Sequence, residues 1–323
     1  MTDVFSNRAS ILFRAAVTVL LGAAFAPPAL AQSAETSETK PVQLTRVRVN
    51  GVDLHYLEMG KGVPIIFVHG GLDDYRMWEA QLKPFPQRYR VIAYSRRYNY
   101  PNNNPHIRPD HSAVVEADDL AALIKKLKLG RAHIVGHSYG AFTALFLAVR
   151  YPELVRTLVL AEPPVMRWAQ EKPEGRALFR EFMDNLWTPA GEAFRRGDKE
   201  QALRVTVKYF AGEGVFDQVP EAQRKYWIGN LREWQALTTS RDAFPALSRE
   251  IVKRIKAPAL MLSGERTLPI HKFVDGELQP LLLNGERVVL SNASHDMWSE
   301  QPEACRRAVL AFLAKRAKRI PIE

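Results

Sequence analysis

One pentapeptide, Gly136-His137-Ser138-Tyr139-Gly140, constrains the fold of this chain more than any other segment. It matches G-x-S-x-G and follows an apolar run at 132–135 that predicts a buried strand. Apolar residues recur at helical spacing after it, until Tyr151-Pro152. Glycines on either side of the serine leave room for segments that cross at a sharp strand-to-helix turn. The pattern therefore predicts a turn that exposes the Ser138 hydroxyl at a helix N-terminus, as a candidate nucleophile.

The first 31 residues have the pattern of an export signal. Two arginines precede an apolar stretch at 15–26, and Ala29-Leu30-Ala31 is typical of a signal peptidase site. The stretch is short for a membrane span, so an uncleaved anchor is the lesser alternative. We expect cleavage after Ala31, a polar flexible segment over residues 32–42, and a periplasmic or secreted protein without a stable membrane anchor.

Charge and cysteine usage narrow the class further. The chain has 323 residues and a formal net charge of +10, but its basic residues are scattered and are not interleaved with aromatics. This favours a solvated surface over an acidic partner, and we expect no nucleic-acid partner. Cys305 is the only cysteine, so an internal disulfide cannot form. Cys305, Val309 and Phe312 recur at the spacing of one helical face, so Cys305 is expected in the core.

Strand-like and helix-like runs alternate along most of the chain, which predicts an α/β fold with a mostly parallel sheet. A hairpin is expected around the Asn50-Gly51 turn. The apolar helical stripe over Ala113 to Leu127 is typical of the helices that separate such strands. The expected strands are Leu44 to Asn50, Val52 to Glu58, Ile65 to Val68, Val91 to Tyr94, Ile134 to Val135, Leu158 to Ala161, Ala259 to Leu262 and Val288 to Leu290.

The interval from 163 to 256 interrupts this alternation. It has helical segments rich in aromatic residues and no convincing strand. Such an insertion after a core strand predicts a helical lid, whose aromatics would line an apolar pocket. Alternatively, most of these aromatics attach the lid to the body. The expected division is a core of residues 43–162 and 257–323 with a lid of residues 163–256.

With these features in order, the chain resembles the alpha/beta-hydrolase fold family from about Leu44 to the C-terminus. The resemblance is carried by His69-Gly70-Gly71 after the third expected strand, by the elbow at 136–140, by the insertion after the sixth strand and by His295 after the eighth. It implies an eight-stranded, mostly parallel sheet flanked by helices, with a helical lid after strand six.

A serine hydroxyl needs a neighbouring base, and His295 lies in a loop that could deliver one. His271 is the best rival among the other histidines. By the family's pattern, the backbone N–H groups of Gly71 and Tyr139 would form the oxyanion hole.

The acid departs from the usual pattern of the family. Many members have Asp in a G-x-x-D arrangement after strand seven, where this chain reads Gly264-Glu265-Arg266-Thr267. Glu162 ends the apolar run at 158–161 and is followed by two prolines, a position that some relatives use for the acid. We therefore predict a Ser138–His295–Glu162 triad, with Glu265 and Asp275 as the alternative acids. Asp296 adjoins His295 in sequence but is poorly placed to orient it.

The function predicted from these residues is hydrolysis of a small carboxylic ester or lactone, with an apolar or aromatic group, through an acyl-enzyme. Relatives that open epoxides or displace halide have Asp at the elbow, so Ser138 speaks against both reactions. A carbon–carbon bond hydrolase or an acyltransferase could use the same triad. A binding protein with a hydrolase shell is the alternative from another class. No metal or organic cofactor is implied.

Overall fold

The structure is a computed structural model, and it describes residues 43–317. The predicted signal peptide at 1–31 and the segment at 32–42 lie outside the described residues. All eight predicted strands form one sheet, in the order β1-β2-β4-β3-β5-β6-β7-β8. The strands are β1 (Leu44–Val49), β2 (Val52–Met59), β3 (Val63–Val68), β4 (Tyr89–Tyr94), β5 (Ala132–His137), β6 (Val155–Ala161), β7 (Ala259–Gly264) and β8 (Gly285–Leu290).

The sheet is antiparallel at one edge and parallel elsewhere. β1 and β2 form the predicted hairpin, and β2 also pairs with β4 in antiparallel orientation. Asn50 and Gly51 have φ of +46° and +78°, the positive values that a two-residue hairpin turn needs. From β4 onwards the neighbours are parallel, so the carboxyl ends of these strands share one edge of the sheet.

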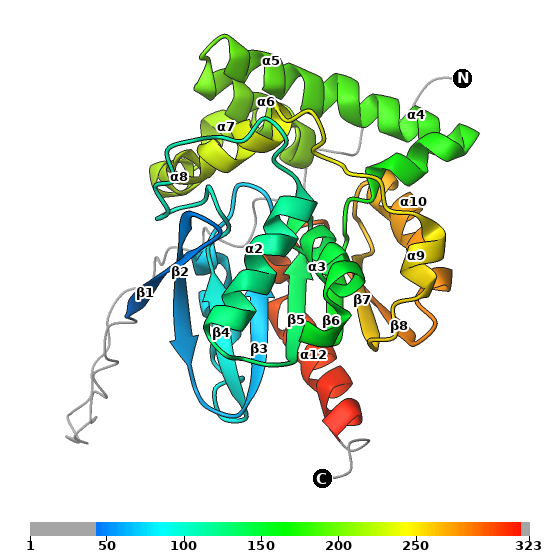
Figure 1. Cartoon of the computed structure of the whole chain (residues 1–323). Helices are drawn as coiled ribbons and strands as arrows, with labels where there is room; N and C mark the ends of the chain where they lie inside the picture. Colours follow the sequence, from blue (N-terminus) through cyan, green and yellow to red (C-terminus); the bar gives the residue numbers. More distant parts are fainter. Residues whose placement is uncertain (1–42, 318–323) are drawn as a thin grey trace, which may run out of the picture.

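Helices cover both faces of the sheet, as a doubly buried parallel sheet requires. Ile66 and Val68 of β3 pack into the core under α2 and α3, whereas Ile65 and Phe67 pack into the core on the other face. In Figure 1, α2 and α3 lie in front of the sheet and α12 lies behind it. The flanking helices are α1 (Glu79–Leu82), α2 (Ala113–Lys126), α3 (Tyr139–Arg150), α9 (Arg249–Lys253), α10 (Pro269–Leu278), α11 (Met297–Glu300) and α12 (Pro302–Ala317).

The residues between β6 and β7, all of which the structure describes, are helices and loops without a strand. All of their helices except α9 form a layer at one end of the sheet (Figure 1). Trp168, Phe182, Trp187 and Trp234 are buried and belong to the same core cluster as residues of the sheet, α2 and α3, whereas Phe210 is 36% exposed. The helices are α4 (Pro173–Phe182), α5 (Thr188–Arg195), α6 (Lys199–Ala211), α7 (Val215–Gln218) and α8 (Glu221–Thr238).

Short turns join several of these elements. A π-helical turn, η4 (Met183–Trp187), connects α4 to α5. The 3-10 turns are η1 (Tyr75–Trp78), η2 (Pro152–Leu154), η3 (Met166–Glu171) and η5 (Gln279–Leu281). Over residues 43–317, no helix combines the length and the apolar character needed to cross a membrane.

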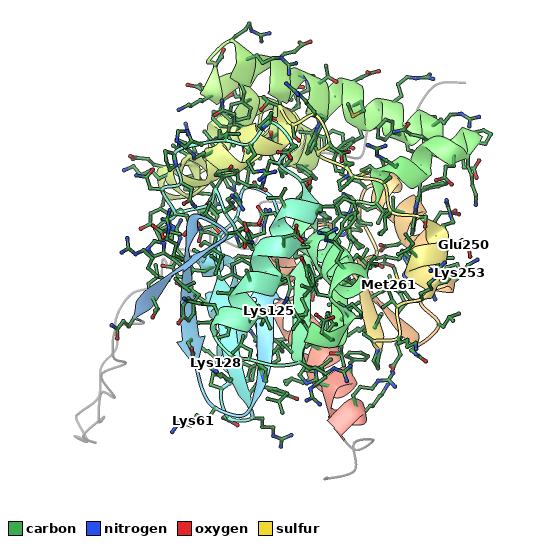
Figure 2. All side chains as sticks on the ribbon, viewed as in Figure 1. Lys61, Lys125, Lys128, Glu250, Lys253 and Met261 are labelled. Atoms are coloured by element: carbon green, nitrogen blue, oxygen red, sulfur yellow. The ribbon has the colours of Figure 1, made fainter. Side chains whose placement is uncertain are left out.

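Cationic side chains are spread over the surface, as the sequence predicts. Lys61 and Lys128 lie near the end of the sheet opposite the helical layer, Lys125 lies on α2, and Lys253 lies on α9 (Figure 2). All four are exposed, and Lys253 pairs with Glu250 at 2.9 Å. Such exposed, screened pairs contribute little to stability.

Cys305 is fully buried on α12, together with Val309 and Phe312. Its thiol donates a hydrogen bond to the Met297 carbonyl at 3.4 Å, and burial raises the pKa of the thiol to about 12. The prediction of a core position is therefore confirmed.

Candidate active site

The nucleophile elbow has the geometry that its glycines predict. Ser138 lies between the end of β5 and the start of α3, with φ +51° and ψ −122°, a strained conformation for a residue with a side chain. A Cβ on Gly136 would lie 2.6 Å from the Ala141 Cα, and one on Gly140 would lie 2.2 Å from the Val68 carbonyl oxygen. Only glycine fits at either position, so the Gly residues permit the crossing that projects Ser138 outward.

His295, in the loop between β8 and α11, reaches Ser138. Its Nε2 lies 2.9 Å from the Ser138 Oγ, although 157 residues separate the two in the sequence. One aromatic neighbour of the imidazole comes from the helical insertion, since the Phe210 ring on α6 stacks at 5.7 Å between centroids. The insertion therefore contributes a side chain directly beside His295.

Glu162 lies on the other side of His295. It directly follows β6, has φ +50° and is fully buried. Its Oε2 is 2.5 Å from His295 Nδ1 and also accepts a hydrogen bond of 2.7 Å from the Thr267 hydroxyl, while its Oε1 accepts one of 2.7 Å from the Gly264 N–H. Ser138, His295 and Glu162 thus form one hydrogen-bonded chain, in the order that the sequence predicts.

The alternative acids make other contacts. Glu265 is exposed and accepts a hydrogen bond of 2.9 Å from the Asn292 N–H. Asp275 is buried and accepts a hydrogen bond from the Ser263 hydroxyl, and burial, together with the nearby Glu162, raises its pKa to about 7. Asp296 accepts a hydrogen bond of 2.9 Å from the Ser299 hydroxyl. The structure therefore brings Glu162, and none of these three, to His295 Nδ1.

Three other histidines surround the site, and burial keeps them neutral. It lowers the pKa of His69 and that of His137 to about 3, and the pKa of His271 falls well below its usual value. His69 Nε2 accepts a hydrogen bond of 2.9 Å from the Arg96 N–H. His137 Nε2 lies 2.9 Å from the His295 carbonyl oxygen, so it supports the backbone of that loop.

Of the two predicted oxyanion donors, Tyr139 directly follows the nucleophile, and Gly71 follows Gly70 in the loop after β3. Tyr139 is the first residue of α3, so its N–H has no acceptor within the helix. Gly70 packs against the nucleophile, because a Cβ on Gly70 would lie 3.3 Å from the Ser138 Cβ. Gly71 faces the helical insertion, where an added Cβ would lie 2.8 Å from the Trp234 ring.

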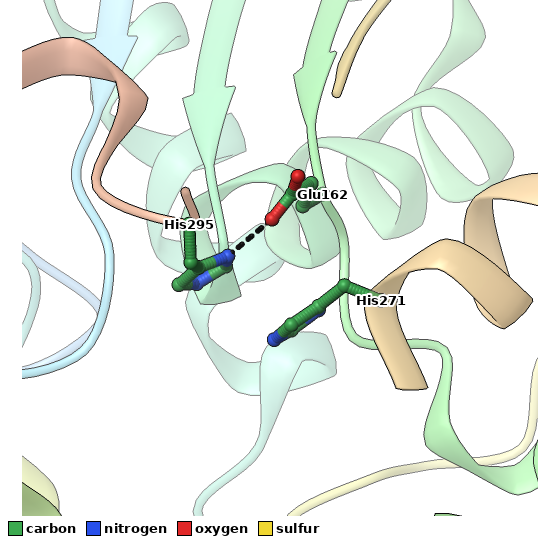
Figure 3. Close-up of side chains that lie close together, drawn as sticks. All are labelled: Glu162, His271 and His295. Carbon is green, nitrogen blue, oxygen red and sulfur yellow. Dashed lines mark hydrogen bonds and ion pairs between the residues drawn. The ribbon is translucent and has the colours of Figure 1, made fainter. Parts of the chain in front are cut away.

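One group of possible metal ligands occurs among the described residues. The ligand atoms of Glu162, His271 and His295 lie within 4.8 Å of one another, and Figure 3 shows His271 beside the His295–Glu162 pair. The two imidazoles stack at 4.1 Å between centroids and 11° between planes. Nitrogen lone pairs lie in the ring planes, so two nearly parallel rings cannot direct them at one ion about 2 Å from each. The arrangement fits a triad with a stacked neighbour better than a metal centre.

Sequence reasoning missed several residues of the site. It identifies Thr267 only as a residue that cannot serve as the acid, and nothing in the sequence links it to Glu162. The Arg96 side chain is fully buried and donates to the carbonyls of His69 and Gly70. Glu233 of the insertion has no distinguishing signal, although its carboxylate lies 2.6 Å from Arg96 Nη2.

Comparison with known proteins identifies the family. A model of the alpha/beta hydrolase family matches residues 65–308. The chain belongs to this family. It is 26% identical over 291 residues to a bifunctional esterase/perhydrolase of Acinetobacter calcoaceticus, a match that covers 82% of this chain and 97% of that protein. It is also 30% identical over 295 residues to epoxide hydrolase 3 of Mus musculus, which covers 85% of this chain and 77% of that protein.

Solved structures agree with the fold of this alpha/beta hydrolase. The enol-lactonase from Burkholderia xenovorans superimposes with a TM-score of 0.68 at 21% identity, over 84% of this chain and 100% of that chain. At this identity the likeness bears on the fold alone. The family includes esterases, lactonases and other hydrolases, so the chain is placed among hydrolases.

Proposed function

We propose that this alpha/beta hydrolase cleaves a carboxylic ester or lactone through an acyl-enzyme on Ser138. The observation behind the proposal is the hydrogen-bonded chain from Ser138 Oγ through His295 to Glu162, with distances of 2.9 and 2.5 Å. A serine next to a base that is itself oriented by a carboxylate is the arrangement that activates a hydroxyl for acyl transfer.

The reaction has two halves. Ser138 Oγ attacks the carbonyl carbon while its proton moves to His295 Nε2, and Glu162 balances the charge of the imidazolium. The Gly71 and Tyr139 N–H groups stabilise the oxyanion. His295 then gives its proton to the leaving alkoxide, the C–O bond breaks, and the acyl group remains on Ser138. Water attacks this ester, loses a proton to His295, and the acid leaves as the proton returns to Ser138.

The substrate is proposed to be a small molecule with an apolar or aromatic group. Phe210, the exposed aromatic of α6, stacks beside His295, and an apolar acyl or alcohol group would fit against such a ring. In this proposal residues 163–256 act as the lid. The esterase/perhydrolase named among the relatives supports ester chemistry, and turnover across esters and lactones of graded chain length would define the preference.

The export proposal rests on the sequence of residues 1–31 alone. Expression of the full chain in a Gram-negative host, followed by fractionation and N-terminal sequencing, tests it. A mature periplasmic or secreted protein that begins at Gln32 is expected. A cytoplasmic protein that retains residues 1–31 would contradict both the cleavage site and the localisation.

A fluorophosphonate probe tests the enzymatic proposal directly, because such probes phosphonylate an activated serine. Labelling of the unmodified protein, abolished in Ser138→Ala, is the expected result. The variant's circular dichroism spectrum should match that of the unmodified protein, since Ser138 makes no core contact that alanine would lose. A well-folded protein that is not labelled would favour a binding protein with a hydrolase shell.

A further inference from the structure

Helix α8 of the insertion contacts the loop that follows β3 with one face. Tyr226, Asn230, Glu233 and Trp234 recur at the spacing of one helical face, and each touches this loop, which we call the oxyanion loop (residues 69–74). The Tyr226 hydroxyl accepts a hydrogen bond from the Asp74 N–H at 3.3 Å, and Asn230 Nδ2 donates to the Asp74 carboxylate at 2.7 Å. The loop is therefore held from the insertion as well as from the sheet.

Two of these contacts fall next to the proposed oxyanion donor. The Trp234 ring lies against Gly71, where it would be 2.8 Å from an added Cβ. Leu72 has φ +57°, an uncommon conformation for a residue other than glycine. Its N–H donates to Glu233 Oε2 at 3.3 Å. The strained residue after Gly71 is thus tied to α8.

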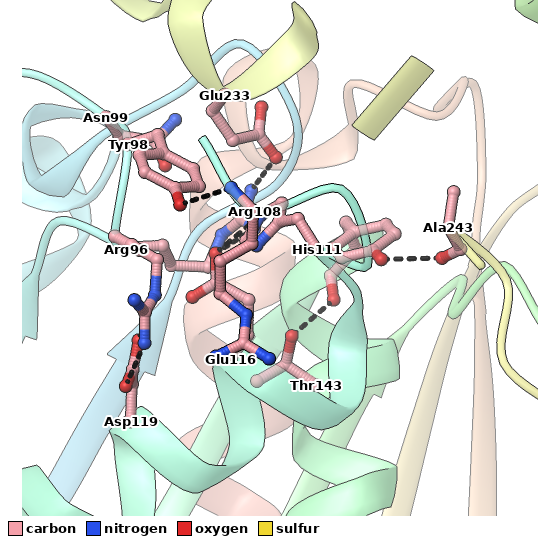
Figure 4. A network of polar contacts seen from close by, with 12 residues as sticks. Arg96, Tyr98, Asn99, Arg108, His111, Glu116, Asp119, Thr143, Glu233 and Ala243 are labelled. Carbon is pink, nitrogen blue, oxygen red and sulfur yellow. Dashed lines mark hydrogen bonds and ion pairs between the residues drawn. The ribbon is translucent and has the colours of Figure 1, made fainter. Parts of the chain in front are cut away.

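Arg96 holds the same loop from the other side. It is fully buried, as is Glu233, and its Nη2 donates to Glu233 Oε1 at 2.6 Å and to the Gly70 carbonyl at 2.9 Å. Its Nε donates to the His69 carbonyl at 3.1 Å. Figure 4 shows Arg96, Glu116 and Glu233 in one polar network. Burial would lower the pKa of Arg96, but Glu233 and Glu116 outweigh this and raise it, so the guanidinium is charged.

These contacts fix the orientation of one peptide bond. His69 is neutral and its Nε2 accepts from the Arg96 N–H, so its Nδ1 carries the proton and donates to the Gly70 carbonyl at 2.9 Å. The Gly70 oxygen therefore accepts from both His69 and Arg96. In a planar trans peptide the N–H points opposite to the carbonyl, so the Gly71 N–H is turned away from Arg96.

We propose that the buried Arg96–Glu233 pair is a positioning device, through which α8 of the helical insertion holds the Gly71 N–H in its oxyanion-binding orientation. The inference rests on the proposed function in that it takes Gly71 as an oxyanion donor. Neither Arg96 nor Glu233 touches the reacting atoms; both act through the Gly70–Gly71 peptide. The insertion is then a fixed part of the active site where α8 meets the loop.

Glu233→Gln is the first test. It removes the negative charge that anchors Arg96, so kcat for a good ester substrate should fall about tenfold to a hundredfold. This fall is no larger than the one expected when an oxyanion donor is removed altogether. KM should change little, because the oxyanion forms only in the transition state. The affinity for a trifluoromethyl ketone, which forms an oxyanion on Ser138, should fall in proportion to kcat/KM. The affinity for an uncleavable amide of the same shape should not.

Asp119→Asn is the matched control. Asp119 pairs with Arg97, the residue next to Arg96, at 2.7 Å, and both partners are buried. This substitution also breaks a buried arginine–carboxylate pair on the same loop, but the pair lies away from residues 69–72. It should lower thermal stability while kcat stays within about twofold. If Glu233→Gln does not fold, Arg96→Lys replaces it, because lysine keeps the charge but cannot donate to Gly70 and Glu233 in the same geometry.

Two outcomes would overturn the proposal. One is a folded Glu233→Gln or Arg96→Lys protein with unchanged kcat and unchanged ketone affinity. The other is a loss of kcat that Asp119→Asn reproduces, which would mean a general effect of lost stability. Failure of the underlying function is distinguishable, since the unmodified protein would then show no probe labelling that depends on Ser138.

Discussion

The Thr267 hydroxyl donates a hydrogen bond of 2.7 Å to Glu162 Oε2, the carboxylate oxygen that also faces His295 Nδ1 at 2.5 Å. Thr267 occupies the place after β7 where the family's pattern often has the acid. β6 and β7 are parallel neighbours, with Ala161 opposite Leu262, so their carboxyl ends lie side by side. The loop after β7 thus supports a carboxylate that the end of β6 supplies.

Thr267→Val tests this support. Valine keeps the shape of the side chain but removes the donor, which leaves a buried carboxylate oxygen with one hydrogen bond fewer. A hydrogen bond to a charged group is worth about 1.5–3 kcal/mol, so we expect kcat to fall about tenfold with KM nearly constant. Thr45→Val on the edge strand β1 is the control and should leave kcat unchanged. Equal kcat in Thr267→Val and the unmodified enzyme would show that this bond does not hold the acid.

Glu162→Gln tests the acid itself. An amide cannot balance the charge of the His295 imidazolium and can stabilise the wrong tautomer, so kcat should fall by about 10⁴. Glu265→Gln is the matched control, because Glu265 is exposed and its carboxylate accepts a hydrogen bond from the Asn292 N–H, away from His295. This substitution should lower kcat only slightly. Steady-state kinetics of both purified variants, with circular dichroism to check folding, decide the assignment. A mild Glu162→Gln with a severe Glu265→Gln would reverse it.

The position of the acid suggests a stronger version of the same test. In Glu162→Gln with Thr267→Asp, a carboxylate returns from the adjacent strand end. We expect the double variant to recover part of the activity that Glu162→Gln loses, because the new carboxylate lies near the same Nδ1–H. A double variant no more active than Glu162→Gln would mean that the loop after β7 cannot present an acid to His295.

Local patterns predicted most of the fold and the reacting residues. The Asn50-Gly51 turn, the apolar strands and the elbow are each encoded within about ten residues, where periodicity and glycine spacing have direct physical meaning. Glu162 could be singled out because it ends an apolar run and precedes two prolines. In the structure its carboxylate contacts the His295 ring, although the two residues are 133 positions apart in the sequence.

The supporting contacts had no comparable signal. Arg96 and Glu233 are 137 residues apart, and nothing in the sequence pairs the two. Nothing in the sequence links Thr267 to Glu162 either, since the two are 105 residues apart. A buried polar pair is specified by how separate elements pack, so a single sequence cannot distinguish it from two surface residues.

Two helical glycines offer a direct contrast in stability. A Cβ on Gly140 in α3 would lie 2.2 Å from the Val68 carbonyl oxygen, whereas one on Gly276 in α10 would meet no atom within 4 Å. Gly140→Ala must displace backbone, so we expect it to lose about 3 kcal/mol or more of unfolding free energy, or not to fold. Gly276→Ala should gain about 0.5–1 kcal/mol, because alanine is the better helix former. Urea denaturation measures both, and a stable Gly140→Ala protein would contradict the elbow geometry.

The pH dependence of stability should depend on Asp275. Burial, followed by the nearby charge of Glu162, raises its pKa from 3.8 to about 7, and its Oδ1 is buried without a hydrogen-bond partner. A raised carboxyl pKa means that the folded state holds the proton more tightly than the unfolded state. The stability that this provides is complete below about pH 4 and is lost as the pH rises through about 7.

Asp275→Asn removes this titration while keeping the shape of the side chain. Between pH 5 and 8 the unmodified protein should therefore lose about 2–3 kcal/mol more unfolding free energy than the variant, since the unfolded state is ionised over this range, the folded state ionises only near pH 7, and each pH unit of that difference corresponds to about 1.4 kcal/mol. Urea denaturation at pH 5, 6, 7 and 8 gives the two slopes. Asp184→Asn, at an exposed position on η4, should keep the unmodified slope. Parallel pH profiles for Asp275→Asn and the unmodified protein would show that Asp275 does not titrate in this range.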